Sequence, residues 1–207
     1  MDKYNYNNSK FGTHHIIARE IGRGKVILDV GCNKGYLGAI TPGNIFYGVE
    51  MSRDDARHAI EKNKYKKVLT LDLNEYQKIN LKKKFDVIVF ADILEHLVEP
   101  EKVLRHFVNN LLKKGGTVIV SLPNVANIAT RVGLLFGNFD YADSGILDST
   151  HLHLYTPNSG KLLLKSARLK ISKTLFSSNN FGFLIHSFPV LGPLLGFNLI
   201  FKCQKKS

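Results

Sequence analysis

The stretch Lys25–Gly35, KVILDVGCNKG, constrains the fold more than any other part of the sequence. Its apolar run Val26–Leu28 is short and rich in β-branched residues, which is typical of one buried strand. Gly31 and Gly35 follow, and then a helical pattern begins. Strand, glycine turn and helix in this order begin a doubly wound α/β sheet, in which ligands bind beyond the carboxyl ends of the strands. Because glycine lacks Cβ and tolerates positive φ, the backbone here can approach a bound molecule closely.

The next predicted strand, Ile45–Glu50, ends on an acid. This acid follows Asp29 by about 20 residues, which is the separation expected of a carboxylate that binds a ribose diol. The glycine spacing is G-x-x-x-G and lacks the pattern of a dinucleotide pyrophosphate loop. We therefore expect a ribose-containing ligand that is not a dinucleotide.

The rest of the chain alternates apolar runs with helical patterns, which predicts a parallel sheet with right-handed crossovers. Further strands are expected over Lys67–Leu71, Phe85–Phe90, Thr117–Leu122, Lys170–Phe176 and Gly196–Cys203. Helices are expected over Phe11–Ile21, Tyr36–Ile40, Arg53–Lys64, Asn74–Leu81, Pro100–Leu112, Val125–Phe136 and Pro157–Ala167. Lysines and glycines at Lys113–Gly116 favour a helix end there.

The composition is that of an ordinary globular protein. The chain has 207 residues, 44% of them hydrophobic and 22% charged, which suits one domain over residues 1–207. Residues 1–10 are polar and are expected to be mobile, and no apolar leader is visible there. Two cysteines, Cys32 and Cys203, give neither a disulfide framework nor a zinc pattern, so we expect a reducing, cytoplasmic location. Cys32 is expected to be a small buried filler.

The net charge of +12 bears on which molecules the protein binds, not on its fold. Nucleic acid, an anionic membrane or a phosphorylated substrate would each fit, as would a lysine-rich solvated surface. Phe181–Phe201 contains no Lys, Arg, Asp or Glu and is about as long as a membrane span, but proline and glycine interrupt it. We expect an apolar loop followed by a strand. The alternative is a lip that touches an anionic membrane, flanked by Lys202, Lys205 and Lys206.

The segments DVGCNKG and YGVE resemble the first two motifs of the class I S-adenosylmethionine-dependent methyltransferases. The resemblance implies a Rossmann-like, doubly wound, seven-stranded and mostly parallel sheet with the last strand antiparallel and helices on both faces. Asn33 stands where the middle glycine of the family's first motif normally lies. Asparagine is the next most tolerant residue of left-handed backbone, so the turn can survive.

The resemblance also implies S-adenosylmethionine as the cofactor, with S-adenosylhomocysteine as its product. Glu50 would accept the ribose hydroxyls, Asp72 would accept the adenine amino group and Asp29 would hold the turn or the amino group of the methionine tail. Backbone carbonyls would contact that tail after the fourth strand. The full predicted cofactor set is Asp29, Gly31, Asn33, Gly35, Glu50, Met51, Asp72, Leu73, Phe90 and Ala91.

The segment Asp92–Leu97, DILEHL, resembles the family's segment after the fourth strand, which lies across the cofactor's methyl group. The ordinary pKa of His96 suits it to accept a hydroxyl proton near neutral pH. Packing of the loop by His96 without substrate contact is an equally good interpretation. His96 and His151 are the two candidate catalytic residues.

The segment Gly145–His153 resembles a subgroup of these methyltransferases associated with bacterial surface-polysaccharide and methionine-biosynthesis genes. It predicts an acceptor-side lid over residues 123–160. Candidate acceptor-binding residues are Asn124, Asp148, His153 and Tyr155.

The two lid histidines alternate with leucines, so His151 and His153 would face the same way in an extended segment. An Asp/His metal site can be considered, but no third ligand is evident from the spacing. We therefore expect no metal here and favour a structural hydrogen-bonding cluster.

Taken together, these expectations predict a methyltransferase that acts on a small or lipid-linked polar acceptor, phosphorylated acceptors included, with O-methylation of a sugar as the leading case. The alternative is a non-catalytic partner protein with the same fold. Asn33 and the short helix expected over Tyr36–Ile40 favour that alternative, whereas Glu50, Asp72 and the polar lid disfavour it. RNA methylation would fit the charge, but the chain has Ala-Asp-Ile-Leu where base N-methylation needs an Asn-Pro-Pro-Tyr type motif, so nucleic acid is not expected. The sequence leaves the oligomeric state open.

Overall fold

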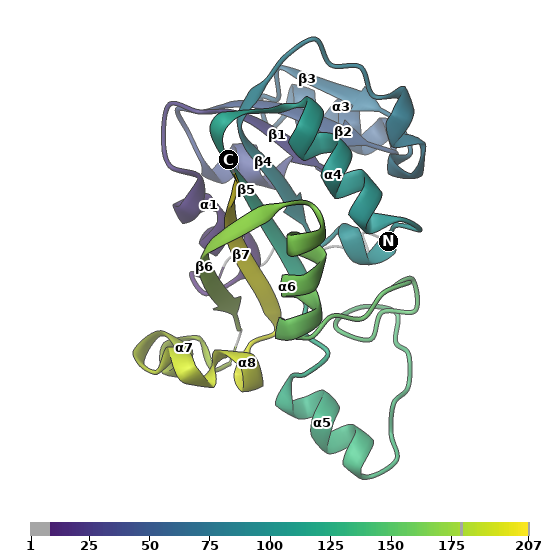
Figure 1. Cartoon of the computed structure of the whole chain (residues 1–207), viewed down its shortest axis with the longest axis vertical. Helices are drawn as coiled ribbons and strands as arrows, with labels where there is room; N and C mark the ends of the chain where they lie inside the picture. Colours follow the sequence, from purple (N-terminus) through teal and green to yellow (C-terminus); the bar gives the residue numbers. More distant parts are fainter. Residues whose placement is uncertain (1–8, 179, 207) are drawn as a thin grey trace.

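A computed structural model describes residues 9–178 and 180–206 (Figure 1). The predicted mobile segment 1–10 lies almost entirely outside these residues. The described chain forms one sheet covered by helices on both faces.

The sheet has seven strands in the order β3-β2-β1-β4-β5-β7-β6. β1 to β5 pair in parallel, and β7 pairs antiparallel with both β5 and β6. This confirms the predicted doubly wound sheet with its last strand reversed. The strands are β1 Val26–Val30, β2 Ile45–Glu50, β3 Lys67–Thr70, β4 Phe85–Ala91, β5 Leu112–Pro123, β6 Leu169–Ser177 and β7 Asn198–Lys205.

The helices divide between the two faces because successive strand residues point to opposite sides. On one face, Ile27 of β1 packs with side chains of α1, α2 and α3. On the other face, Leu28 packs with side chains of α4 and α6. The α-helices are α1 Thr13–Ile21, α2 Tyr36–Ile40, α3 Arg53–Glu61, α4 Pro100–Asn110, α5 Ile128–Leu135, α6 Pro157–Ser166, α7 Gly182–Ser187 and α8 Gly192–Leu195. Three short 3₁₀ helices are η1 Leu73–Lys78, η2 Leu94–His96 and η3 Pro189–Leu191.

Several predicted helix boundaries are wrong. The helix expected over Arg53–Lys64 ends at Glu61, that over Val125–Phe136 begins at Ile128, and that over Asn74–Leu81 is the 3₁₀ helix η1. The helix expected over Pro100–Leu112 ends at Asn110, and Lys113–Gly116 belongs to the long strand β5 rather than to a helix end. The pairing of β5 with β4 shifts register near Phe85, and Gly115 takes a φ of 73°. A glycine in the left-handed region lets the strand continue through this irregularity, which the composition of a helix end does not distinguish.

The apolar segment after β6 is also helical rather than a loop. It forms α7, η3 and α8, which lie at the same end of the sheet as α5 (Figure 1). α7 is short because a proline follows it closely: Phe188, with φ −131° and ψ 80°, is not helical and precedes Pro189. The residue before a proline disfavours helical backbone. Within residues 9–178 and 180–206, no helix is long and apolar enough to cross a membrane.

Candidate active site

A cavity of about 800 Å³ lies at the carboxyl ends of the parallel strands, at the turn after β1, the end of β2 and the segment after β4. This is the position at which doubly wound sheets bind ligands, and the volume suits a small molecule. The predicted site residues that line it are Asp29, Gly31, Asn33, Glu50, Met51, Asp72, Leu73, Ala91, His96, Asp148 and His151.

The turn after β1 has the left-handed backbone that the sequence predicts. Gly31 has a φ of 73°, Asn33 a φ of 46° and Gly35 a φ of 79°. The Asn33 Oδ1 atom accepts a hydrogen bond from the backbone N–H of Lys34 at 2.6 Å. Asn33 therefore replaces a glycine in the turn, and its side chain stabilises the turn.

The two glycines of the turn have different roles. A Cβ on Gly31 would lie 2.6 Å from Cγ1 of Ile93, so Gly31 lets the segment after β4 approach the cavity. A Cβ on Gly35 would lie 2.7 Å from the Tyr65 ring. Gly35 does not line the cavity, and it instead allows close packing of the start of α2 against Tyr65.

The Glu50 carboxylate connects the turn after β1 to the residues after β2 at the edge of the cavity. Its Oε2 atom accepts from the backbone N–H of Asn33 at 2.8 Å, and its Oε1 atom accepts from that of Ser52 at 2.9 Å. Each carboxylate oxygen keeps further acceptor capacity for a ligand hydroxyl. Met51, next in sequence, is 68% exposed and lies at the rim.

Asp29 is buried at the bottom of the cavity. Its Oδ2 atom accepts from the Tyr65 hydroxyl at 2.6 Å, whereas Oδ1 has no hydrogen-bond partner in the described part of the chain. Burial raises the pKa of Asp29 to about 7. Tyr65, which lies after α3, carries no local sequence signal for this contact.

The remaining cofactor candidates divide between the cavity and the core. Asp72 caps η1, because its Oδ1 atom accepts from the backbone N–H of Asn74 at 2.8 Å. Leu73 and Ala91 line the cavity. Phe90 does not: its side chain is fully buried and packs against Phe107 in the core.

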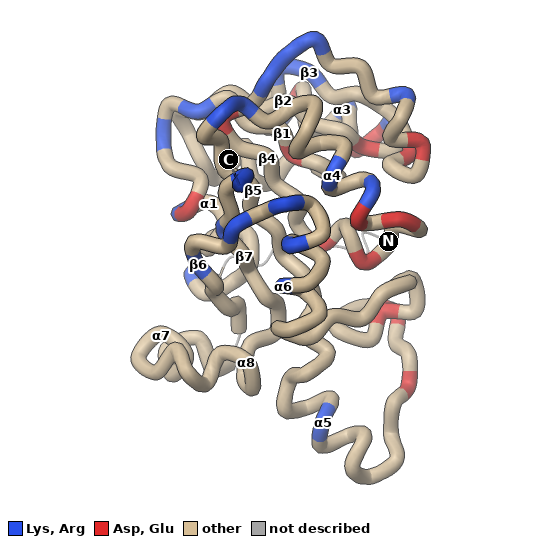
Figure 2. Tube along the Cα trace, in the orientation of Figure 1, with Lys and Arg blue, Asp and Glu red and all other residues tan. Residues whose placement is uncertain are grey.

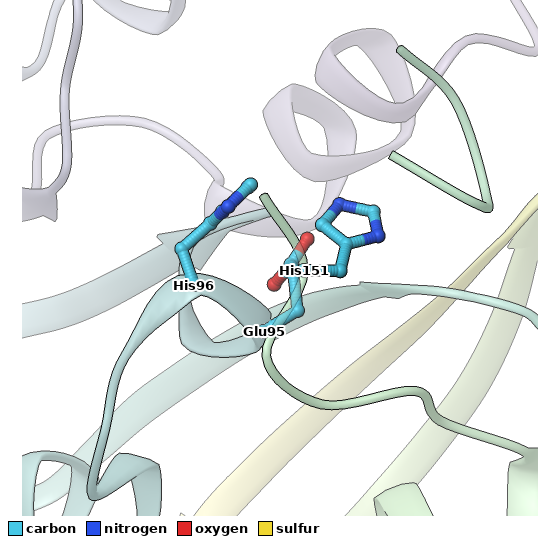
Figure 3. Close-up of side chains that lie close together, drawn as sticks. All are labelled: Glu95, His96 and His151. Carbon is cyan, nitrogen blue, oxygen red and sulfur yellow. The ribbon is translucent and has the colours of Figure 1, made fainter. Parts of the chain in front are cut away.

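A cluster of one carboxylate and two imidazoles lines the far side of the cavity, made by Glu95, His96 and His151 (Figure 3). The two imidazole rings lie 4.8 Å apart between centroids. The Glu95 side chain is fully buried, and neither carboxylate oxygen has a hydrogen-bond partner within residues 9–178 and 180–206. Burial raises the pKa of Glu95 well above its ordinary value and lowers the pKa of His96.

The loop that carries Asp148 and His151, called the lid loop below, packs on η2 through backbone and side-chain hydrogen bonds. The backbone N–H groups of Leu152 and His153 both donate to the carbonyl of Glu95, at 2.9 and 3.1 Å. Asp148 is buried, and its Oδ1 atom accepts from the N–H and the hydroxyl of Thr150, at 2.8 and 2.7 Å. These bonds bring His151 to the cavity although it is distant in sequence.

Comparison with known proteins identifies the family. A family model described as "Methyltransferase domain" matches residues 10–173.

The chain belongs to the methyltransferase domain family.

Curated and solved relatives agree with this assignment. The methyltransferase is 32% identical over 110 residues to the ubiquinone biosynthesis O-methyltransferase of Glaesserella parasuis, a match that covers 49% of this chain and 46% of that protein. It thus spans about half the length of the curated relatives that it matches.

Two solved structures share the fold. An S-adenosylmethionine-dependent methyltransferase from Clostridium acetobutylicum has a TM-score of 0.64 at 16% identity, covering 97% of this chain and 93% of that one. Magnesium protoporphyrin IX methyltransferase from Synechocystis, solved with bound S-adenosylhomocysteine, has a TM-score of 0.61 at 18% identity, covering 92% and 78%. The family model thus confirms the resemblance at the level of the methyltransferase family, and these two structures confirm the fold.

Three predicted acceptor residues of the methyltransferase lie outside the main cavity. His153 contacts the Leu97 carbonyl through Nε2 at 3.0 Å, and with Tyr155 it lines a separate hollow of about 410 Å³ beside α6. His151 and His153 do not share a hollow, as an extended segment would allow: His151 lines the main cavity, and a bend at Leu152 separates it from His153. Asn124 is buried, and its amide donates to the carbonyls of Pro193 and Gly196, so it holds the chain after β5 against α8.

The sequence also missed residues that complete the methyltransferase cavity. Asp92 has a φ of 50°, and its Oδ1 atom accepts from the Ser121 hydroxyl at 2.6 Å and the Asn198 amide at 2.7 Å. Thr13 and His14 of α1 line the opposite wall. Asn198 begins the last strand and Thr13 begins the first helix, so only the sheet topology brings them together.

Proposed function

We propose that this methyltransferase transfers the methyl group of S-adenosylmethionine to an oxygen atom of a small or lipid-linked polar acceptor. Transfer is a direct displacement at an activated methyl, so the protein contributes mainly alignment of the reactants and activation of the hydroxyl. One observation carries the proposal: a single cavity joins the strand ends of a methyltransferase sheet to a cluster of carboxylate and imidazole groups.

On the cofactor side, Glu50 would accept the ribose hydroxyls, which its remaining lone pairs allow. Asp72 and Leu73 would contact the adenine. Asp29 would bind the amino group of the methionine tail, and that positive charge would favour the ionised form of the carboxyl. Backbone of Gly31 and Ala91 would line the tail.

On the acceptor side, His96 and His151 would lie at the reacting centre, and Asp148 would shape the loop that carries His151. A sugar hydroxyl is the leading acceptor, and a phosphorylated acceptor is compatible with the net charge of +12. The curated relatives named as ubiquinone biosynthesis O-methyltransferases support an oxygen acceptor. Nucleic acid is not expected as a partner, and we place the reaction in the cytoplasm.

An apolar end of the molecule with few charged residues supports a lipid-linked acceptor. The helices α5, α7 and η3 expose large side chains and carry almost no Lys, Arg, Asp or Glu (Figure 2). The exposed residues there are Val132, Leu134, Leu135, Phe136, Phe181, Phe183, Leu184, Phe188 and Val190.

A peripheral membrane contact would rely on these apolar side chains rather than on lysines. Lys202 and Lys205 lie toward the far end of β7, which begins at Asn198 beside α8. Lys206 follows the strand. The flanking lysines that the sequence suggested are therefore on the wrong side to reinforce such a contact.

The test measures binding and turnover separately. S-adenosylhomocysteine should bind in a calorimetric titration, and a screen of sugars, sugar phosphates and lipid-linked sugars should release S-adenosylhomocysteine from S-adenosylmethionine with at least one acceptor. Firm binding without turnover across the screen would favour the partner-protein alternative, and absence of binding would contradict the proposal itself.

A further inference from the structure

We propose that Glu95, His96 and His151 form a binding site for a divalent transition-metal cation at the acceptor end of the cavity. Each residue offers one ligand atom, and the three atoms lie within 4.8 Å of one another (Figure 3). The sequence favoured a structural cluster because no third ligand was evident near His151 and His153. The third ligand, Glu95, comes from η2, which the lid loop covers.

Both imidazoles keep one ring nitrogen available to a cation. The His96 Nδ1 atom lies 3.2 Å from the Thr150 carbonyl and 3.1 Å from the Thr150 hydroxyl. The His151 Nδ1 atom lies 3.1 Å from the Ile146 carbonyl. A carbonyl oxygen can only accept, so each Nδ1 carries the proton and each Nε2 keeps its lone pair. Metal-bound histidines are commonly fixed in this way, by donation from the second ring nitrogen to a carbonyl.

The Glu95 carboxylate provides an independent observation. It is fully buried, and neither of its oxygens has a partner among the residues that the structure describes. Leaving a buried polar group without a partner is unfavourable, and such groups call for a functional explanation. A cation between Glu95 and the two imidazoles would provide the missing partner.

The ligand set indicates the kind of cation. Two imidazoles and one carboxylate suit zinc, manganese, iron(II) or cobalt, whereas magnesium and calcium prefer oxygen ligands alone. Zinc bonds of about 2.0–2.2 Å imply ligand atoms about 3–3.5 Å apart, so the side chains must close by roughly an ångström. Rotation of the half-buried His96 and His151 side chains can provide this movement.

Three protein ligands leave at least one coordination position open. That position would face the cavity shared with Asp29 and Glu50. An acceptor hydroxyl bound there would have a lowered pKa. In this arrangement the histidines act on the acceptor through the cation. This role rests on the proposed function, whereas binding of the cation does not.

Titration with cobalt(II) chloride tests the site directly, on full-length protein freed of any affinity tag. Visible absorption should report saturable binding of one cobalt ion per chain. Glu95→Gln and His151→Ala should each weaken binding at least tenfold. His153→Ala is the matched control and should bind cobalt as the wild type does, because His153 lies on the same loop but its Nε2 contacts the Leu97 carbonyl.

Several outcomes would overturn the site. These are no saturable binding by the wild type, unchanged binding by both variants, or equal weakening by His153→Ala. Circular dichroism and a melting curve must first show that each variant is folded, and His151→Ala, on a surface loop, serves if Glu95→Gln does not fold. Wild-type protein that binds S-adenosylhomocysteine but not cobalt would exclude the cation site alone, whereas the reverse result would contradict the proposed function alone.

Discussion

The two halves of the cavity are built in different ways. In the cofactor half, Gly31, Asn33 and Glu50 come from consecutive strand ends, and backbone conformation with a few main-chain hydrogen bonds fixes them. In the acceptor half, side chains from segments far apart in sequence meet, as His96 and His151 do. The first half is thus specified by short motifs, and the second depends on how the lid docks.

Glu50→Ala should produce the largest change. It removes the acceptor for the Asn33 and Ser52 N–H groups as well as for the ribose hydroxyls. At roughly 1.5–3 kcal/mol for each hydrogen bond to a charged group, loss of two ribose contacts implies about 3–6 kcal/mol of binding free energy. Calorimetry with S-adenosylhomocysteine measures this loss. Glu61→Ala, at the exposed end of α3, should bind normally, and equal affinities for the two variants would remove Glu50 from the site.

Asp29→Asn should change how stability depends on pH. Burial holds the pKa of Asp29 at about 7, above its ordinary value of 3.8. Between these values the unfolded chain has lost the proton and the folded chain retains it, so the wild-type free energy of unfolding should fall as pH rises through this window. The shift corresponds to at most about 4 kcal/mol.

The Asp29→Asn variant should lack that decline, and the exposed Asp140→Asn should keep it. Urea denaturation without ligand, repeated across the window, measures both. If all three proteins lose stability in parallel, Asp29 is not the group responsible.

His151→Ala should lower turnover without lowering cofactor affinity, which would show that the two halves of the cavity act independently. It removes a group of the acceptor half without touching the strand ends, so turnover should fall about 100-fold, or about 2.7 kcal/mol, while S-adenosylhomocysteine affinity stays within about twofold. His186→Ala, exposed on α7, is the control for removal of an imidazole. A joint fall in melting temperature and cofactor affinity would show that His151 is structural and that the halves are not separable.

Asn33→Gly should have the smallest effect. Glycine adopts positive φ without strain, but the hydrogen bond from the Lys34 N–H to Oδ1 is lost. These effects oppose each other, so cofactor affinity should change by less than about 1 kcal/mol. A tenfold loss in calorimetry would show that the Asn33 side chain contacts the cofactor, in which case the cofactor half would not be set by backbone alone.

The same contrast explains what the sequence could predict. The alternation of strands and helices along the chain, the left-handed Asn33 and the position of Glu50 at a strand end all follow from patterns within a few residues. The orientation of His151 relative to His153 does not, because it depends on a turn and on hydrogen bonds to the Glu95 carbonyl. The short helices α7 and α8 were missed because their apolar pattern is broken by proline.

The two hydrogen bonds that Glu50 accepts from the protein have a consequence for exchange of the methyl donor. They join the turn after β1 to the end of β2 through the protein's own groups. A donor molecule therefore meets a rim that these hydrogen bonds hold in place, and little of its binding free energy should be lost to ordering the chain. Release of S-adenosylhomocysteine should likewise leave these hydrogen bonds, and the turn that they hold, unchanged. The cycle of arrival and departure can then run without local refolding on this side of the cavity.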